Sequence, residues 1–170
     1  YAQVDLALAQ HLENFENSLS PQYGLAYLPS PSIVKLRLFS KNGASKDEFE
    51  AKSQTLKSLL GDAVISTRDI PLPQILGEKL LEKKLTLATA ESCTGGNISK
   101  QIVSISGSSA YFCGSVVSYS NKVKERTLGV SSSSIETHGA VSQEVVTEMV
   151  RGVKQLMQTA FYQGETPGPN

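Results

Sequence analysis

"LTLATAESCTGG", residues 85–96, is the segment on which the expected fold and chemistry of this chain depend. Its first six residues are mostly apolar, which is typical of a buried strand. Ser92, Cys93 and Thr94 come soon after, and two glycines then let the backbone turn tightly before the next helical pattern begins. The segment therefore predicts a strand that passes through a sharp turn into a helix.

The chain on either side of this segment alternates between helical and strand-like patterns. An amphipathic helical pattern precedes the segment, and a further strand and further helices follow it. Such an alternation implies a layered α/β domain. The predicted helices cover residues 74–84, 95–106, 121–129 and 142–160, and the predicted strands cover residues 85–90 and 114–120.

The first part of the chain has a different order of elements and predicts a small α+β domain of its own. The order is helix, strand, strand, helix and strand, with Ser45 as the expected N-cap of the second helix and Gly61 at its end. The two prolines of "RDIPLPQ" mark the linker. We therefore place the domains at residues 1–70 and 71–170. The predicted strands lie in "YGLAYLPSPS", "IVKLRLFS" and "AVIST", the last at residues 63–67.

The composition is that of a globular protein with no strong electrostatic preference. The 170 residues carry 16 basic and 16 acidic side chains, so the net charge is zero and no attraction to nucleic acid or anionic lipid is implied. Two cysteines predict neither a disulfide framework nor a metal cluster. No secretory signal or membrane-spanning run is evident. We therefore expect a cytoplasmic protein without metal or cofactor and without a membrane partner.

Ser92 has two interpretations at the strand-to-helix turn. It can be a nucleophile, since helix N-terminal amides would stabilise the oxyanion formed when it attacks a carbonyl. Ser92 or Thr94 can instead cap the helix, and the pattern alone favours this interpretation, because serine and threonine are common N-caps. Cys93 is a rival nucleophile, but the pattern favours a small buried cysteine, since free cysteine is among the most buried residue types.

A second strand-to-helix junction, "SYSNKVK" at residues 118–124, offers a base for such a nucleophile. A lysine in a pocket can be neutral and accept the proton of a serine, and Tyr119 can relay that proton or orient the lysine. Lys122 and Lys124 point to different sides of the predicted helix, so we expect only one of them to enter a pocket. The alternative is a solvated basic helix start.

His138 is the remaining acid–base candidate. It can be a general base, but its place in "THGAVSQE" favours a loop residue before a helix that Ser142 caps. The chain has no metal-ligand spacing, no Walker loop and no GxGxxG motif. A basic surface interleaved with aromatic residues is also absent, so nucleic acid is not an expected partner.

Three segments together resemble the C-terminal domain of the competence/damage-inducible CinA family. They are "LTLATAESCTGG", "SGSSAYFCGSVVSYSNKVKERTLGV" and "HGAVSQEVVTEMVRGV", which occur in order over about residues 72–158. The resemblance implies a nicotinamide-nucleotide amidohydrolase, which converts nicotinamide mononucleotide to nicotinate mononucleotide and ammonia. The implied partner is this small nucleotide substrate, and we expect a homo-oligomer.

The resemblance also implies roles for individual residues. The family's serine nucleophile falls on Ser92, its catalytic tyrosine on Tyr119 and its lysine on Lys124. The implied reaction is attack of Ser92 on the amide carbonyl, proton acceptance by Lys124 with help from Tyr119, release of ammonia and hydrolysis of an acyl-enzyme. The backbone around Thr94, Gly95 and Gly96 is predicted to contact an oxyanion or a phosphate, and Asn121 is a further predicted substrate-binding residue.

The flanking segments set the limits of the resemblance. "LAYLPSPSIVKLRL" resembles the small KH-like domain that joins an N-terminal molybdopterin-binding-like domain to the amidohydrolase domain in full-length members. After the last helix, family members continue with a "TGIAGP"-like loop, whereas this chain has "MQTAFYQGETPGPN". We therefore expect an incomplete amidohydrolase domain that exposes a sheet edge. The alternative function is a non-catalytic binding or scaffold fragment of a competence/damage-inducible protein.

Overall fold

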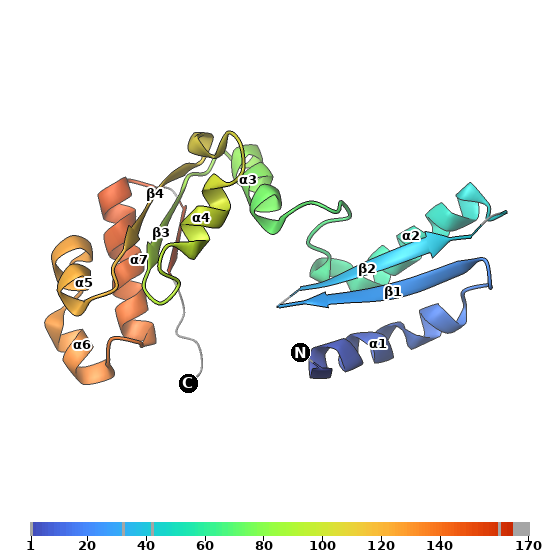
Figure 1. Cartoon of the computed structure of the whole chain (residues 1–170), viewed down its shortest axis with the longest axis horizontal. Coiled ribbons are helices and arrows are strands. Elements are labelled where there is room, and N and C mark those ends of the chain that lie inside the picture. Colours follow the sequence, from blue (N-terminus) through green and yellow to red (C-terminus); the bar gives the residue numbers. More distant parts are fainter. Residues whose placement is uncertain (1, 32, 42, 160, 165–170) are drawn as a thin grey trace. The chain divides into compact units, whose positions relative to one another are not determined.

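The computed structural model describes residues 2–31, 33–41, 43–159 and 161–164. The chain forms two compact units, residues 1–67 and 68–170, whose elements follow one another along the chain in Figure 1. Helices and strands are mixed in both units, which confirms the predicted α/β class. The likeness of the first unit to a KH-like domain stays a prediction.

The first unit packs two helices against a β-hairpin. The strands pair antiparallel, with Tyr23 opposite Ser40 at one end and Ser30 opposite Ile33 at the other. Their core face packs on buried side chains of the two helices, among them Leu12. The elements are α1 (Ala2–Asn17), β1 (Tyr23–Ser30), β2 (Ile33–Ser40), α2 (Lys46–Leu60) and the 3₁₀ turn η1 (Gly61–Ala63).

The second unit is built on a parallel sheet with strand order β4-β3-β5. The middle strand β3 is buried at all five of its residues. Its strands are β3 (Leu87–Glu91), β4 (Phe112–Val117) and β5 (Phe161–Gly164). Its helices are α3 (Leu72–Glu82), α4 (Asn97–Val103), α5 (Asn121–Leu128), α6 (Ser132–His138) and α7 (Gln143–Met157), with the 3₁₀ turn η2 (Ser108–Ala110) after α4.

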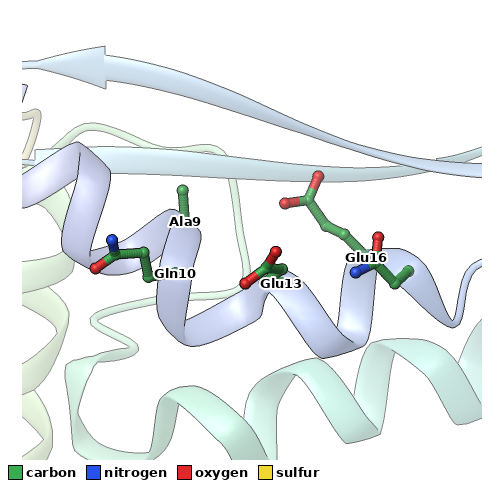
Figure 2. Close-up of a pocket in the computed structure, with 5 residues that line it drawn as sticks. Ala9, Gln10, Glu13 and Glu16 are labelled. Atoms are coloured by element: carbon green, nitrogen blue, oxygen red, sulfur yellow. The ribbon is translucent and has the colours of Figure 1, made fainter.

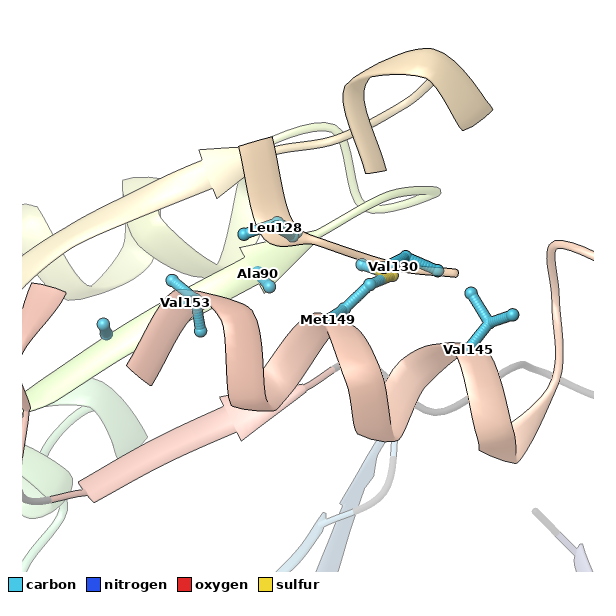
Figure 3. Close-up of a cluster of buried hydrophobic side chains, with 7 residues drawn as sticks. Ala90, Leu128, Val130, Val145, Met149 and Val153 are labelled. Atoms are coloured by element: carbon cyan, nitrogen blue, oxygen red, sulfur yellow. The ribbon is translucent and has the colours of Figure 1, made fainter. Parts of the chain in front are cut away.

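Helix α7 contributes more buried side chains than any other element to the core that lies against one face of this sheet. Figure 3 shows Val145, Met149 and Val153 along one side of α7, pointing toward Ala90 of β3 and toward the end of α5. These side chains recur at the i, i+4 and i+8 spacing of one helical face. A second buried cluster, around Leu87, joins α3 and α4 to the sheet. The central strand is thereby held between hydrophobic clusters.

The helix-end signals of the sequence are confirmed at three positions. Ser45 accepts a hydrogen bond from the Glu48 amide at the start of α2, and Gly61 ends that helix with φ 51°. Ser142 accepts from the Val145 amide at the start of α7. Each side chain satisfies a backbone donor that has no partner inside its own helix.

The strand predicted at residues 63–67 is wrong. After Gly61 the chain continues into the turn η1, where the Val64 amide donates to the Gly61 carbonyl at 3.2 Å, and residues 64–67 join neither strand of the hairpin. Ile65 stays 49% exposed. A short segment rich in β-branched residues therefore forms a strand only where a sheet edge is placed to receive it.

One helix and one strand of the second unit were not predicted. The serine-rich stretch at 131–134 begins α6, because the Glu148 carboxylate of α7 accepts hydrogen bonds from the Ser131 amide and the Ser134 hydroxyl. Strand β5 adds a third strand beside β3, with Leu87 opposite Phe161. The central strand β3 therefore has a neighbouring strand on each side.

A substitution at Gly152 tests how closely α7 approaches the end of α5. A Cβ at this position would overlap the carbonyl oxygen of Leu128 and lie 2.7 Å from its carbonyl carbon. We expect Gly152→Ala to lower the free energy of unfolding by about 3 kcal/mol, because backbone cannot move aside as a side chain can. Urea denaturation measures the change. The control Gln155→Ala, at an exposed position of α7, should change stability by less than about 0.5 kcal/mol, and equal effects of the two would contradict the close packing.

Candidate active site

The turn after β3 and the turn after β4 lie side by side at one edge of the sheet. The two strands are parallel neighbours, so their carboxyl ends meet. The Ser118 amide, one residue beyond β4, donates to the Glu91 carbonyl at 2.7 Å. Segments that are far apart in the sequence are thereby joined at the point where each strand gives way to a turn.

Ser92 and Lys124 are in contact across these two turns. Lys124 Nζ donates to Ser92 Oγ at 2.9 Å and to the carbonyl oxygen of Ser118 at 2.7 Å. The lysine side chain is only 2% exposed. An alcohol and an amine at this distance can exchange a proton, and the carbonyl of Ser118 holds the amine in place.

The first turn of α5 decides which lysine enters the site. Ser120 caps this helix by accepting from the Val123 amide at 3.4 Å. Lys124 lies one helical turn after the cap and points back toward the sheet edge, whereas Lys122 is exposed. The expectation that only one of the two lysines enters a pocket is confirmed.

Glu91 is buried beneath the same turn. It is 0% exposed, and its carboxylate accepts from Thr94 Oγ1 at 2.7 Å, from the Ser99 amide at 2.8 Å and from the Ile98 amide at 3.0 Å. Burial alone would raise the pKa of Glu91, but these hydrogen bonds together hold the pKa below its usual value of 4.5. An ionised carboxylate therefore sits on the N-terminal amides of α4.

Sequence reasoning missed Glu91, although a signal was present. A glutamate that ends an apolar strand and directly precedes a turn into a helix is placed to be buried near that helix's amide donors. The pattern does not tell whether such a side chain turns inward or outward. Its role became visible only through the contacts from Thr94, Ile98 and Ser99.

The other predicted site residues occupy different environments. Tyr119 is 76% exposed and faces solvent, and Asn121 is exposed at the start of α5. Gly95 and Gly96 have φ values of 59° and 95°, which form the tight turn and are strained for residues with a side chain. The predicted catalytic role of Tyr119 stays a prediction, as do the substrate contacts predicted for Asn121, Gly95, Gly96 and Thr94.

Cys93 is exposed, so the prediction of a small buried cysteine is wrong. It follows Ser92 in the turn, where successive side chains point in different directions, and the buried side of the turn is taken by Glu91 and Lys124. His138 is exposed at the last residue of α6, a helix rather than the expected loop. The fold therefore brings together Ser92 and Lys124, and the other nucleophile and base candidates face solvent.

A shallow pocket lies in the first unit, along α1. Figure 2 shows that it is lined from this single helix, and the Glu16 carboxylate there already accepts a hydrogen bond from the Tyr27 hydroxyl at 2.8 Å. We assign the pocket no chemistry, because none of the predicted site residues belongs to it. Its lining residues are Ala9, Gln10, Glu13, Glu16 and Asn17.

Two negative findings apply to the described residues alone. No group of three or more histidine, cysteine, aspartate or glutamate side chains among them is arranged to hold a metal ion. No helix in the described part of the chain has the length and apolar character needed to cross a bilayer.

Comparison with known proteins adds an independent observation to this geometry. A family model described as "CinA C-terminal domain" matches residues 69–164, which contain both turns of the site. The chain belongs to the CinA family. CinA-like proteins of Flavobacterium psychrophilum and Salinibacter ruber are each 40% identical to it, over 100% and 91% of the chain. These alignments cover 42% and 38% of the relatives, so the chain spans less than half of their length.

Solved structures of family members share the fold of the CinA chain. The competence damage-inducible protein A (ComA) of Klebsiella pneumoniae is 31% identical, with a TM-score of 0.53 over 54% of this chain and 56% of that one. The competence/damage inducible protein CihA of Agrobacterium tumefaciens is 34% identical, with a TM-score of 0.52 over 54% and 55%. The fold of the CinA domain is therefore supported by sequence and structure alike.

The ionised state of Glu91 predicts how stability depends on pH. Because the pKa is lowered in the folded state, the stabilisation is complete above the unfolded value near 4.5 and is lost as pH falls below it. At pH 7 we expect Glu91→Gln to lower the free energy of unfolding by about 2 kcal/mol, since one oxygen is replaced by an amide donor that faces other donors. The difference between the two proteins should shrink as pH falls from 4.5 toward 3. Urea denaturation at each pH measures it, and a difference that stays constant would contradict the role of the charge.

Proposed function

We propose that this CinA domain carries the nucleophile and base of a nicotinamide-nucleotide amidohydrolase. The observation that supports the proposal is the 2.9 Å contact between Ser92 Oγ and the buried Nζ of Lys124. A serine–lysine pair at the carboxyl ends of parallel strands is a nucleophile with its own base, and it does not need histidine. The substrate rests on the family resemblance, in which nicotinamide mononucleotide yields nicotinate mononucleotide and ammonia.

The proposed reaction passes through an acyl-enzyme. The reactive form has a neutral Lys124 amine, the form that burial favours over an ammonium ion in general. Ser92 Oγ attacks the amide carbonyl carbon while its proton moves to Lys124 Nζ. The tetrahedral intermediate collapses, the C–N bond breaks, and Lys124 returns the proton to the leaving nitrogen, which departs as ammonia. Water then attacks the ester carbonyl and gives one proton to Lys124, which passes it to Ser92 Oγ as the ester C–O bond breaks. The carboxylic acid that is released loses its remaining proton to solvent.

The oxyanion needs donors other than the amides in the first turn of α4, because two of these amides are already occupied. The Ile98 and Ser99 amides donate to Glu91, and the Gly95 amide donates to the Ser92 carbonyl at 3.1 Å. In the proposal, backbone amides of the turn from Thr94 to Gly96 turn toward the oxyanion when substrate is bound. Tyr119, exposed beside the site, is proposed to close over the substrate and assist Lys124.

Substitution of the pair tests the proposal in the complete natural protein. Ser92→Ala and Lys124→Met should each reduce ammonia release from nicotinamide mononucleotide by at least about 10³-fold, because each removes a member of the reacting pair. An enzyme-coupled ammonia assay measures turnover, and circular dichroism confirms that the variants fold. Lys122→Met is the matched control on the exposed side of α5 and should keep full activity.

Three outcomes would contradict the proposal. Retained turnover in folded Ser92→Ala protein would remove the serine as the nucleophile. Absence of ammonia release from the wild-type protein would reject this substrate. Loss of activity in Lys122→Met to the same extent as in Lys124→Met would show that the buried contact is not what matters.

A further inference from the structure

Glu91 holds both members of the reacting pair through separate hydrogen bonds. Its carboxylate anchors the turn that carries Ser92, and its backbone carbonyl anchors the peptide group that orients Lys124. We propose that Glu91 is a positioning residue that sets the distance and alignment between the Ser92 hydroxyl and the Lys124 amine. The inference rests on the proposed function for its reaction, but its geometry is independent of the identity of the amide.

The carboxylate fixes the shape of the turn between β3 and α4. Glu91 precedes the turn, and the donors at Thr94, Ile98 and Ser99 lie within it or directly beyond it. Ser115 of β4 adds a longer contact to the same carboxylate at 3.2 Å. The Glu91 side chain therefore links the start of the turn, at Glu91 itself, to the start of α4, and Ser92 lies between these two points.

The backbone of Glu91 begins a second chain of contacts that ends at the nucleophile. The Ser118 amide donates to the Glu91 carbonyl at 2.7 Å, and the Ser118 carbonyl accepts from Lys124 Nζ at 2.7 Å. Lys124 in turn contacts Ser92, which is covalently linked to Glu91. These contacts form a closed ring, so a shift of Glu91 moves the nucleophile and the anchor of the base together.

The two oxygens of the carboxylate receive different amides of α4. Ile98 donates to Oε2 and Ser99 donates to Oε1. A glutamine has one carbonyl oxygen and one NH₂ group, so in either orientation one helix amide faces another donor. Glu91→Gln should therefore loosen the turn while keeping the size of the side chain, and a displacement of about 1 Å at the reacting atoms can reduce the rate about 10²-fold.

Glu148 provides a matched control for a purely structural loss. Its carboxylate also accepts a backbone amide at a helix start, from Ser131 at 2.7 Å, and a hydroxyl, from Ser134 at 2.5 Å. These hydrogen bonds lower its pKa as those of Glu91 do, but they hold α6 on α7. Glu148→Gln should therefore destabilise the fold without changing the geometry of Ser92 and Lys124.

The experiment measures the reactivity of Ser92 directly, in the complete natural protein under conditions where each variant is folded. Phenylmethylsulfonyl fluoride is the probe: the serine oxygen bonds to sulfur, fluoride leaves, and the hydroxyl proton passes to Lys124. Intact mass and peptide mapping give the rate of modification at Ser92. In parallel, kcat and KM are measured for ammonia release from nicotinamide mononucleotide.

For Glu91→Gln we expect the sulfonylation rate and kcat to fall together by about 10²-fold while KM stays within about threefold, because the buried carboxylate does not touch substrate. Glu148→Gln should keep both rates within about twofold. If Glu91→Gln does not fold, Thr94→Val replaces it, since this change removes the 2.7 Å hydrogen bond to the carboxylate. Thr94→Val should also slow sulfonylation, whereas a role in substrate contact alone would leave that rate unchanged.

The two readouts separate the failure of this inference from the failure of the proposed function. Equal sulfonylation rates at Ser92 in wild type and Glu91→Gln would overturn the positioning role, whatever the amide substrate. A similar loss in Glu148→Gln would also overturn it, because the effect would then follow stability. Slower sulfonylation in Glu91→Gln without ammonia release by the wild type would support the positioning role and reject nicotinamide mononucleotide as the substrate.

Discussion

The hydrogen bond from the Ser118 amide to the Glu91 carbonyl is the constraint on which the candidate site depends. It extends the parallel pairing of β3 and β4 by one step beyond the strand ends, and it fixes the relative height of the two turns. Ser92 and Lys124, 32 residues apart in the sequence, meet because these turns begin from the same edge of the sheet. Because the two strands are parallel, a serine in the turn after β3 and a single lysine in the helix after β4 are sufficient to make this contact.

The central position of β3 explains why this edge can hold buried polar groups. The strand has neighbours on both sides, and α7 packs its apolar face on the sheet. The hydrophobic clusters provide the stability that offsets the cost of burying a carboxylate and an amine. The carboxylate is in turn satisfied by hydrogen-bond donors from the turn, from α4 and from β4. Polar groups placed in this way restrict the turn to one shape, and loss of one of them leaves a buried donor without an acceptor.

Local patterns in the sequence were sufficient for part of this arrangement. The strand, the tight turn and the following helix were predicted from residues 85–96, and helix geometry separated Lys122 from Lys124. Tertiary contacts decided the rest. Helix α6 starts where Glu148 of a later helix satisfies its first donors, and the apolar stretch at residues 63–67 forms no strand because the hairpin does not receive it. The burial of Glu91 was not predicted, because the pattern does not tell whether a glutamate at the end of a strand turns toward the following helix or toward solvent.

The same carboxylate also limits where an anionic substrate can be bound. The N-terminus of a helix attracts anions through its free amides, and this made the turn at residues 94–96 a natural phosphate site from the sequence alone. In the folded protein the Ile98 and Ser99 amides already hold the charge of Glu91. A second anion at α4 would meet a buried carboxylate in place of free donors, and the repulsion would be strong at low dielectric. Under the proposed function, the phosphate of the nucleotide is therefore recognised by other groups, and the proposed contribution of α4 is to hold Glu91 rather than to hold substrate.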